Sequence, residues 1–134
     1  MANTFQQEIV TPTRVIDCGP VEYLRAPSVE GLFGVQAGHT RSMISLDVGE
    51  IKVVQDGKDT FYATNGGYAD IHPNNAQLLV ETAEECNTID TARALSAAQR
   101  ARERAKSRTA DTDHSRAEAA LKRALTRLLV AGRM

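Results

Sequence analysis

The sequence lacks tryptophan, contains two cysteines, and has no apolar run that could cross a membrane as a helix. Such a span needs about 18 or more consecutive apolar residues. The opening MANTFQQEIV also lacks the charged and apolar regions of a secretory signal peptide. Cys18 and Cys86 stand alone without the spacing of a zinc site, so the simplest expectation is two free thiols. We therefore expect a cytoplasmic protein.

Motifs of catalysis are also missing. There is no HExxH, GxSxG or phosphate-binding glycine loop. The segment GLFGVQAGHT is rich in glycine, but it lacks the GK[ST] ending of a P-loop, and we interpret it as turns between strands. His39, His72 and His114 are scattered and show no ligand spacing. We expect neither a catalytic constellation nor a metal site, and therefore a protein that is not an enzyme.

The formal net charge of −1 conceals an asymmetry between two parts of the chain. Residues 1–86 carry 5 basic against 12 acidic residues, giving −7, whereas residues 87–134 carry 11 against 5, giving +6. Such a split indicates that the carboxy-terminal part meets an acidic partner or a phosphate.

The first part of the chain has the pattern of an antiparallel β-sandwich. Short runs rich in Val, Ile, Tyr and Phe are separated by turn formers at intervals of about eight to twelve residues, which predicts about eight to ten strands. Pro12, Pro20 and Pro27 are predicted to end strands, because proline cannot donate to a ladder. Asp56-Gly57 predicts a tight hairpin, and YADIH and AQLLVET predict another hairpin about HPNN.

The second part has the composition of two helices. From Ile89 to Lys106 there is neither Gly nor Pro, and good helix formers dominate. The second predicted helix runs to about Ala131, before Gly132, and SRTAD makes a short connection, so the helices should form an antiparallel hairpin. The candidate caps are Thr88 or Asp90 for the first helix and Asp111, Thr112 or Asp113 for the second. We expect a sandwich domain over residues 1–86 and a helical hairpin over residues 87–134.

The apolar stripes of both predicted helices are thin. They consist of Ala94, Leu95, Ala98, Ala101 and Ala105 in the first, and of Ala117, Ala120, Leu121, Ala124, Leu125 and Leu128 in the second. Alanine lets two helices approach closely, but each buried alanine removes little apolar area at about 25 cal/mol per Å². The hairpin should be marginally stable, so a ligand or partner could move it.

The charged residues of the hairpin have a simple interpretation and a sharper one. Asp90 and Arg93 suit a helix start, with an i to i+3 ion pair worth about 0.2 to 0.5 kcal/mol. The basic residues at positions 100–108 suit a solvated helix face. However, a closed antiparallel hairpin should bring four guanidiniums to the same end, where they repel one another unless an anion such as a polyphosphate joins them. These four are Arg93, Arg100, Arg123 and Arg127.

Several segments, in this order and spacing, resemble the epsilon subunit of bacterial and chloroplast ATP synthases. EIVTPTR resembles the family's opening strand and turn, VEGLFGVQAGHT its glycine-punctuated loop, and NGGYADI its Gly-Gly-aromatic strand. LLVETAE, IDTARA and LKRALTRL follow, so the resemblance covers almost the entire chain. It implies the same amino-terminal β-sandwich and carboxy-terminal helical hairpin.

The resemblance implies a non-catalytic rotor component of the central stalk. The sandwich would bind the gamma subunit and the c-ring on the cytoplasmic side of the bacterial plasma membrane, helping to couple proton flow to ATP synthesis. The hairpin would lie folded on the sandwich or extend beside gamma into the catalytic head of alpha and beta subunits, where it restrains ATP hydrolysis. The residues implied to face the c-ring are Glu30, Gly31, Leu32 and His39.

Several bacterial members of the family bind ATP in the folded state through a motif of the form I/L-D-x-x-R-A, which IDTARA matches in full. The resemblance therefore implies ATP as a regulatory ligand, requires no cofactor, and leaves the role of Mg²⁺ open. The acidic residues would lie toward adenine or orient the site, and the arginines would lie toward phosphates. The implied ATP-binding residues are Glu81, Ile89, Asp90, Arg93, Ala94, Arg100, Arg123 and Arg127.

The chain departs from the family pattern around the glycine-punctuated loop. Ala37 replaces the first proline of Pro-Gly-His-Ala-Pro, Thr40-Arg41 replace Ala-Pro, and Leu32 stands where many members have an acid. These changes affect the segment that would face the membrane ring.

An alternative function is a basic module that binds nucleic acid or another protein, because arginine-rich helices bind phosphates without sequence preference. Against nucleic acid, no aromatic residues are interleaved with the arginines, and the predicted sandwich is acidic.

Overall fold

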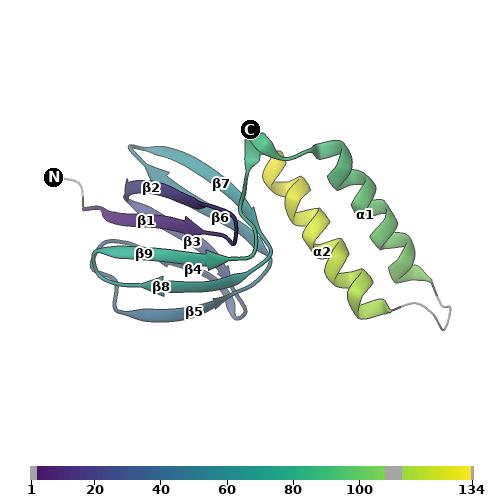
Figure 1. The fold of residues 1–134 in the computed structure, drawn as a ribbon, viewed down its shortest axis with the longest axis horizontal. Coiled ribbons are helices and arrows are strands. Elements are labelled where there is room, and N and C mark those ends of the chain that lie inside the picture. The colour runs from purple at the N-terminus through teal and green to yellow at the C-terminus, as the bar shows by residue number, and fades with distance from the viewer. Residues whose placement is uncertain (1–2, 108–112, 134) are drawn as a thin grey trace.

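The computed structural model describes residues 3–107 and 113–133, and it contains a β-sandwich followed by two helices (Figure 1). The first four strands are β1 (Phe5–Val10), β2 (Val15–Val21), β3 (Tyr23–Ser28) and β4 (Gly31–Val35). They are followed by β5 (Ser42–Leu46), β6 (Gly49–Gln55), β7 (Lys58–Thr64), β8 (Gly67–Ile71), β9 (Asn75–Val80) and β10 (Glu84–Glu85). A short 3₁₀ turn, η1 (Cys86–Thr88), precedes α1 (Thr91–Lys106) and α2 (His114–Ala131).

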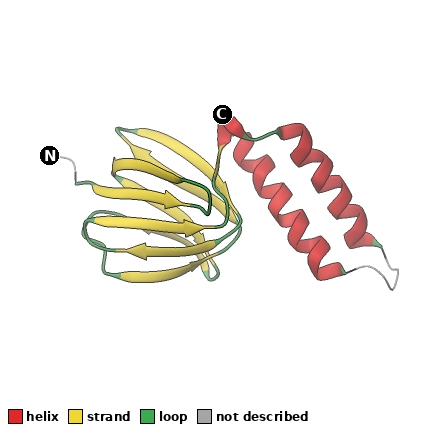
Figure 2. Ribbon diagram, in the orientation of Figure 1, coloured by secondary structure: helices red, strands yellow, loops and turns green. Residues whose placement is uncertain are grey.

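The predicted fold class is confirmed, with one difference in the sandwich. The strands follow the order β10-β7-β6-β3-β5-β8-β9-β1-β2, and β4 pairs with β3 outside this path. Every pairing is antiparallel except β1 with β9, which is parallel. Figure 2 shows the strands together in one body and the helices in another.

The sandwich encloses one apolar core. Its largest fully buried apolar side chains are Phe5, Ile9, Leu24, Ile51, Ile71 and Leu78. In β1 the buried and less buried residues alternate, as expected when one face of a strand lies against a core. The core therefore combines side chains from the first strands and the last strands of the amino-terminal part. The alternate residues of the same strands point away from the core, toward the outer face of the sandwich.

Two of the three predicted proline boundaries are wrong. β1 ends before Pro12 as expected, but Pro20 lies within β2 and Pro27 within β3. β2 is the last strand of the sheet order, and an edge strand accepts proline because one of its sides needs no donor. Pro27 lies near the end of β3, where its carbonyl accepts a hydrogen bond from the Asp47 amide at 3.0 Å.

The predicted hairpins are confirmed. Gln55 pairs with Lys58 around Asp56-Gly57, and both turn residues have positive φ, 52° and 73°, which a two-residue type I′ turn requires. β8 and β9 pair from Gly67–Val80 to Ile71–Ala76, so the HPNN segment closes the second hairpin.

The helices begin at aspartates and touch through alanines. Asp90 and Asp113 are the N-caps, and Asp111 and Thr112 lie outside the described residues. The helix–helix seam buries alanines, among them Ala94, Ala98, Ala101, Ala117 and Ala124. Leu95 and Leu125, predicted to belong to the stripes, are instead 49% and 41% exposed. The seam is therefore even thinner than the sequence pattern indicates.

The hairpin contacts the sandwich through α2, which lies between the sandwich and α1 (Figure 1). α2 packs on β6, β7 and η1. A small apolar cluster joins the two bodies, with Ala63, Ile89 and Val130 buried and Phe61, Cys86 and Ala131 packed around them. This cluster is separate from the core of the sandwich, so the hairpin is held by few apolar contacts.

Candidate functional site

The IDTARA segment forms the start of α1. Asp90 Oδ1 accepts a hydrogen bond from the Arg93 amide at 3.1 Å, which confirms the predicted cap. The ion pairs of the described residues do not include one between the two side chains, so the predicted i to i+3 ion pair does not form. The Arg93 guanidinium is exposed and available to a ligand.

Two apolar residues of the predicted ATP set have packing roles here. Ile89 is 9% exposed in the cluster between hairpin and sandwich, and Ala94 is fully buried in the helix–helix seam. Glu81 is exposed, and its backbone amide donates to the Gly66 carbonyl at 3.0 Å. Their assignment to ATP stays a prediction.

Six arginines form two matching rows on the hairpin. Residues seven and four positions apart share one face of a helix, and both helices carry arginines with this spacing. The row on α1 consists of Arg93, Arg100 and Arg104, and the row on α2 consists of Arg116, Arg123 and Arg127. We call these six residues the arginine rows.

Different members of the arginine rows line two cavities on the hairpin, and the convergence of Arg93, Arg100, Arg123 and Arg127 at one end stays a prediction. Arg93 and Arg100 line an open cavity of about 300 Å³ with Ala92 and Ser96. Arg123 instead lines a cavity of about 580 Å³ with Arg104 and Arg116, from the last turn of α1 and the first turn of α2. Because arginines of both helices line this second cavity, the rows of α1 and α2 face the same side of the hairpin.

Arg127 lines neither of these two cavities, and its guanidinium forms an ion pair with Glu84. Arg127 Nε lies 2.8 Å from Glu84 Oε1, and Nη2 donates to Oε2 at 2.9 Å. Within the described part of the chain, the other five members of the arginine rows have no ion pair. Five unneutralised guanidiniums on one face make an anion-attracting surface.

Sequence reasoning missed three residues of this surface. Glu84, not Glu81, is the acid that the structure brings to an arginine of the predicted set. Nothing in the run of acids at positions 81, 84 and 85 ranks one above another. Arg104 and Arg116 could have been found, because each continues the helical spacing of a neighbouring arginine in its own helix.

A further ion pair joins the side of α2 to the sandwich. Lys122 Nζ donates to Asp47 Oδ2 at 2.8 Å, and this hydrogen bond lowers the pKa of the Asp47 carboxyl below its usual range. Both side chains are about half exposed, so the pair contributes little to stability.

The residues predicted to face the c-ring lie in two places. VEGLFGVQAGHT is not one loop, because its centre forms β4. Glu30, Gly31 and Leu32 lie at the β3–β4 turn, where Leu32 is 67% exposed. His39 follows the other end of β4, where its Nδ1 lies 2.6 Å from the Thr40 carbonyl oxygen. Their contact with the c-ring stays a prediction.

The outer face of the sandwich carries a row of apolar side chains across four neighbouring strands, three of them exposed and one, Val10, half-buried. Tyr68 pairs with Leu79, Leu79 with Val10, and Val10 with Val15, so all four lie in register on the same face. Tyr68, Leu79 and Val15 are 57%, 41% and 59% exposed. We call these four residues the apolar row. A contiguous apolar patch of this kind marks an interaction surface.

Neither metal sites nor membrane spans are found within residues 3–107 and 113–133. No group of three or more His, Cys, Asp or Glu side chains there could hold a metal ion. Neither helix is both long enough and apolar enough to cross a membrane.

Two family models together match almost the entire chain. The model described as the ATP synthase Delta/Epsilon chain, beta-sandwich domain matches residues 4–86, and the long alpha-helix domain of the same chain matches residues 87–132. The chain is 37% identical over 132 residues to the ATP synthase epsilon chain of Nitratidesulfovibrio vulgaris (strain DP4), covering 98% of both chains. It is 36% identical over 129 residues to that of Bacillus velezensis, covering 96% of this chain and 98% of the relative.

Solved structures show the same fold. A chain of the Euglena gracilis mitochondrial ATP synthase matches with a TM-score of 0.84 and 23% identity, covering 100% of this chain and 83% of that one. A chain from the central stalk and c-ring of the Tetrahymena thermophila mitochondrial ATP synthase matches with a TM-score of 0.60 and 16% identity, covering 96% and 94%. None of these relatives supports the alternative of a nucleic-acid module. With both family models matched in sequence order, this chain belongs to the epsilon chains of ATP synthase.

Proposed function

We propose that this chain is a non-catalytic rotor subunit whose sandwich binds the gamma subunit and the c-ring and whose hairpin regulates ATP hydrolysis. As such a subunit it would lie at the cytoplasmic side of the bacterial plasma membrane. The observation that carries the proposal is the apolar row, because three exposed apolar side chains and the half-buried Val10, in register, need a partner surface. The matched Euglena structure comprises the F1 head and c-ring, which agrees with such partners.

The two partners would use different parts of the sandwich. The apolar row is broad and extends over β8, β9, β1 and β2, which suits the side of a long partner such as gamma. The β3–β4 turn is a narrow projection with exposed Val29 and Leu32, 64% and 67% exposed, which suits a contact with the edge of the ring.

Co-purification of the assembled complex tests the rotor role. Tyr68→Asp and Leu79→Asp place charges within the apolar row and should strongly reduce recovery of the chain with gamma. Leu95→Asp is the control, because Leu95 is similarly exposed but lies on α1. Equal recovery of all three variants would exclude the apolar row as the gamma-binding surface.

ATP is the proposed regulatory ligand of the folded hairpin. The five unpaired guanidiniums of the arginine rows repel one another, and a triphosphate would neutralise several of them at once. ATP at 100 times its dissociation constant would stabilise the folded hairpin by about 2.7 kcal/mol, which is large for an element held by few apolar contacts. In the absence of ATP the basic hairpin would extend toward an acidic surface of the catalytic head.

Isothermal titration of the full chain with ATP, with and without Mg²⁺, tests this ligand. Arg93→Ala and Arg123→Ala should each weaken ATP binding by about tenfold or more, because each removes charge-assisted hydrogen bonds to phosphate. Arg102→Ala is the control, because Arg102 is an exposed arginine of α1 outside the arginine rows. Arg127 is less informative, since its loss also removes the ion pair with Glu84. No binding at millimolar ATP would refute the ligand and leave the rotor role intact.

A further inference from the structure

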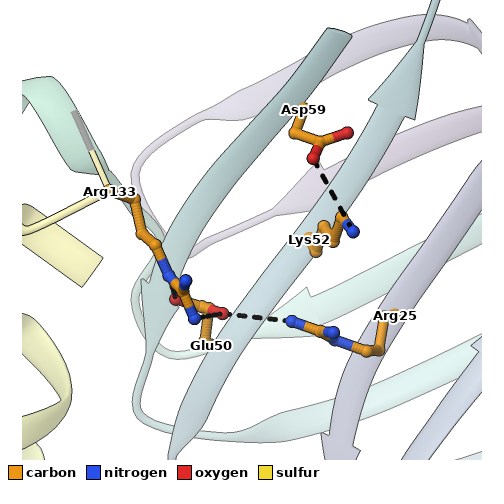
Figure 3. Close-up of polar contacts among 5 residues, drawn as sticks. All are labelled: Arg25, Glu50, Lys52, Asp59 and Arg133. Carbon is orange, nitrogen blue, oxygen red and sulfur yellow. Dashed lines mark hydrogen bonds and ion pairs between the residues drawn. The ribbon is translucent and has the colours of Figure 1, made fainter. Parts of the chain in front are cut away.

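Glu50 is a buried carboxylate held by two arginines from different parts of the chain (Figure 3). It lies on β6 and is 8% exposed, and among the described residues it is the one charged side chain that is buried. Arg133 donates from Nε to Oε2 at 2.9 Å and from Nη2 to Oε1 at 3.2 Å, which makes a bidentate pair. Arg25 donates from Nη2 to Oε1 at 3.2 Å.

The two arginines reach Glu50 by different routes. Arg25 lies on β3, which pairs with β6 in the same sheet, so it stays beside Glu50 wherever the hairpin lies. Arg133 follows the C-cap Gly132 of α2 and is positioned by the helix end, where its amide donates to the Val130 carbonyl at 2.9 Å. Movement of the hairpin would therefore remove Arg133 and leave Arg25.

Phe61 also holds the Arg133 side chain. Its ring centroid lies 5.0 Å from the guanidinium carbon, within the range of a cation–π contact. Phe61 belongs to β7 and packs around the apolar cluster that joins hairpin and sandwich. The neighbouring Lys52 pairs with Asp59 at 3.7 Å and not with Glu50, so the cation that completes the Glu50 site is Arg133 (Figure 3).

Of the three ion pairs that join the hairpin to the sandwich in the described residues, the one at Glu50 has the most buried carboxylate. Asp47 and Glu84 are 40% and 35% exposed, whereas Glu50 is 8% exposed. Exposed pairs are weakened by solvent and salt, and buried ones much less; in the Glu50 pair the carboxylate is shielded in this way, whereas the Arg133 side chain is 41% exposed. A buried carboxylate that loses one partner is also penalised, because water does not replace the lost hydrogen bonds fully.

We propose that Glu50 is the receptor of a latch, in which Arg133 at the end of α2 fastens the hairpin to the sandwich. The inference rests on the proposed movement of the hairpin. Arg25 is the second part of the device: it retains one hydrogen bond to Glu50 when the latch opens, so the sandwich stays folded while the hairpin leaves. Breaking the latch favours the undocked hairpin without unfolding the sandwich.

Hydrogen exchange of the isolated full chain, followed peptide by peptide without ATP or other subunits, tests the latch. Arg133→Ala should speed exchange in the last turns of α2 by about three- to tenfold, while exchange in β8 and β9 stays unchanged. Arg133→Lys should give a smaller effect, because lysine keeps the charge but not the bidentate fork. Arg102→Ala, the matched control, should behave as the parent.

Glu50→Gln supplies the decisive comparison, because it keeps the shape of the side chain and removes its charge. Combined with Arg133→Ala, it should add little to the effect of either change alone, as expected for two partners of one interaction. Additive effects, equal exchange in Arg133→Ala and Arg102→Ala, or equal acceleration of β8 and β9 would each overturn the latch. Failure to bind ATP or gamma would not affect these measurements, so the two proposals fail separately.

Discussion

Val130→Ala should loosen the hairpin from the sandwich more than any exposed substitution on α2. Val130 is fully buried in the cluster with Ala63 and Ile89. Losing two methyl groups costs about 0.8 kcal/mol each in transfer free energy, and the cavity left behind brings the loss to about 2 kcal/mol. Alanine is the better helix former by about 0.5 kcal/mol, but this term cancels if α2 stays helical when it undocks. The ratio of docked to undocked hairpin should then fall by about thirtyfold.

Peptide-resolved hydrogen exchange measures this ratio. Exchange should rise in α2 and in the part of β7 that α2 covers, and stay unchanged in β8 and β9. Leu129→Ala is the control: it removes more atoms from the adjacent position, but Leu129 is 56% exposed. Equal effects of the two substitutions, or a loss of protection spread evenly over the sandwich, would refute the assignment of Val130 to the docking contact.

Three further outcomes are expected. Gly67→Ala should destabilise the sandwich by about 2 kcal/mol or more in chemical denaturation, because φ is +151° and a Cβ there would collide with a backbone oxygen of β9. Gly57→Ala should cost less, because its φ of +73° strains an alanine but no neighbouring atom lies in the way of the added Cβ. Asp90→Ala should lower the helicity of the hairpin by circular dichroism, at a cost of about 1 kcal/mol for the lost cap. The Asp47 carboxyl has a lowered pKa in the folded chain, so its pairing with Lys122 stabilises docking at neutral pH. This contribution is lost as the pH falls through that pKa. In a carbon-detected NMR titration, the Lys122→Ala variant should show a higher Asp47 pKa than the parent chain.

The strands were predictable because their signals are local. Alternating burial and glycine-containing turns identify the β6–β7 and β8–β9 hairpins from a few residues each. The interpretation of Pro20 and Pro27 failed because the effect of a proline depends on whether its strand has a neighbour on the amide side. The order of the strands in the sheet determines which strands have such a neighbour, and this order cannot be read from the residues around each proline.

The sequence predicts that each helix has a face of arginines, but it does not predict which arginines of the two helices lie next to one another. The spacing of arginines along each helix correctly indicates a shared face, because helix geometry alone determines it. Which arginine lies opposite which depends on how the two helices are aligned along the seam, and a seam of alanines has few features that sequence could use to set that alignment. In the structure Arg123 lines one cavity with Arg104 and Arg116, and Arg93 lines another with Arg100.

The Glu50–Arg133 ion pair could not be predicted from the sequence for a related reason. The residues around Glu50 do not indicate which cation binds it, and Arg133 is 83 residues away along the chain. Only docking of α2 on β6 and β7 brings the two together.

The distribution of contacts explains how one chain can combine a rigid and a movable part. Strand ladders and a continuous apolar core hold the sandwich, and neither depends on salt or on a ligand. The hairpin, in contrast, is held by a small apolar cluster and by ion pairs at Asp47, Glu84 and Glu50. Because two of the three ion pairs take their cations from α2 and the third takes Arg133 just after it, an acidic partner or a phosphate competes for the same kind of group that fastens the hairpin. Docking must therefore respond to anions far more strongly than the stability of the sandwich does, with Arg127 the most directly affected cation, since it belongs to both the arginine rows and the docking contact.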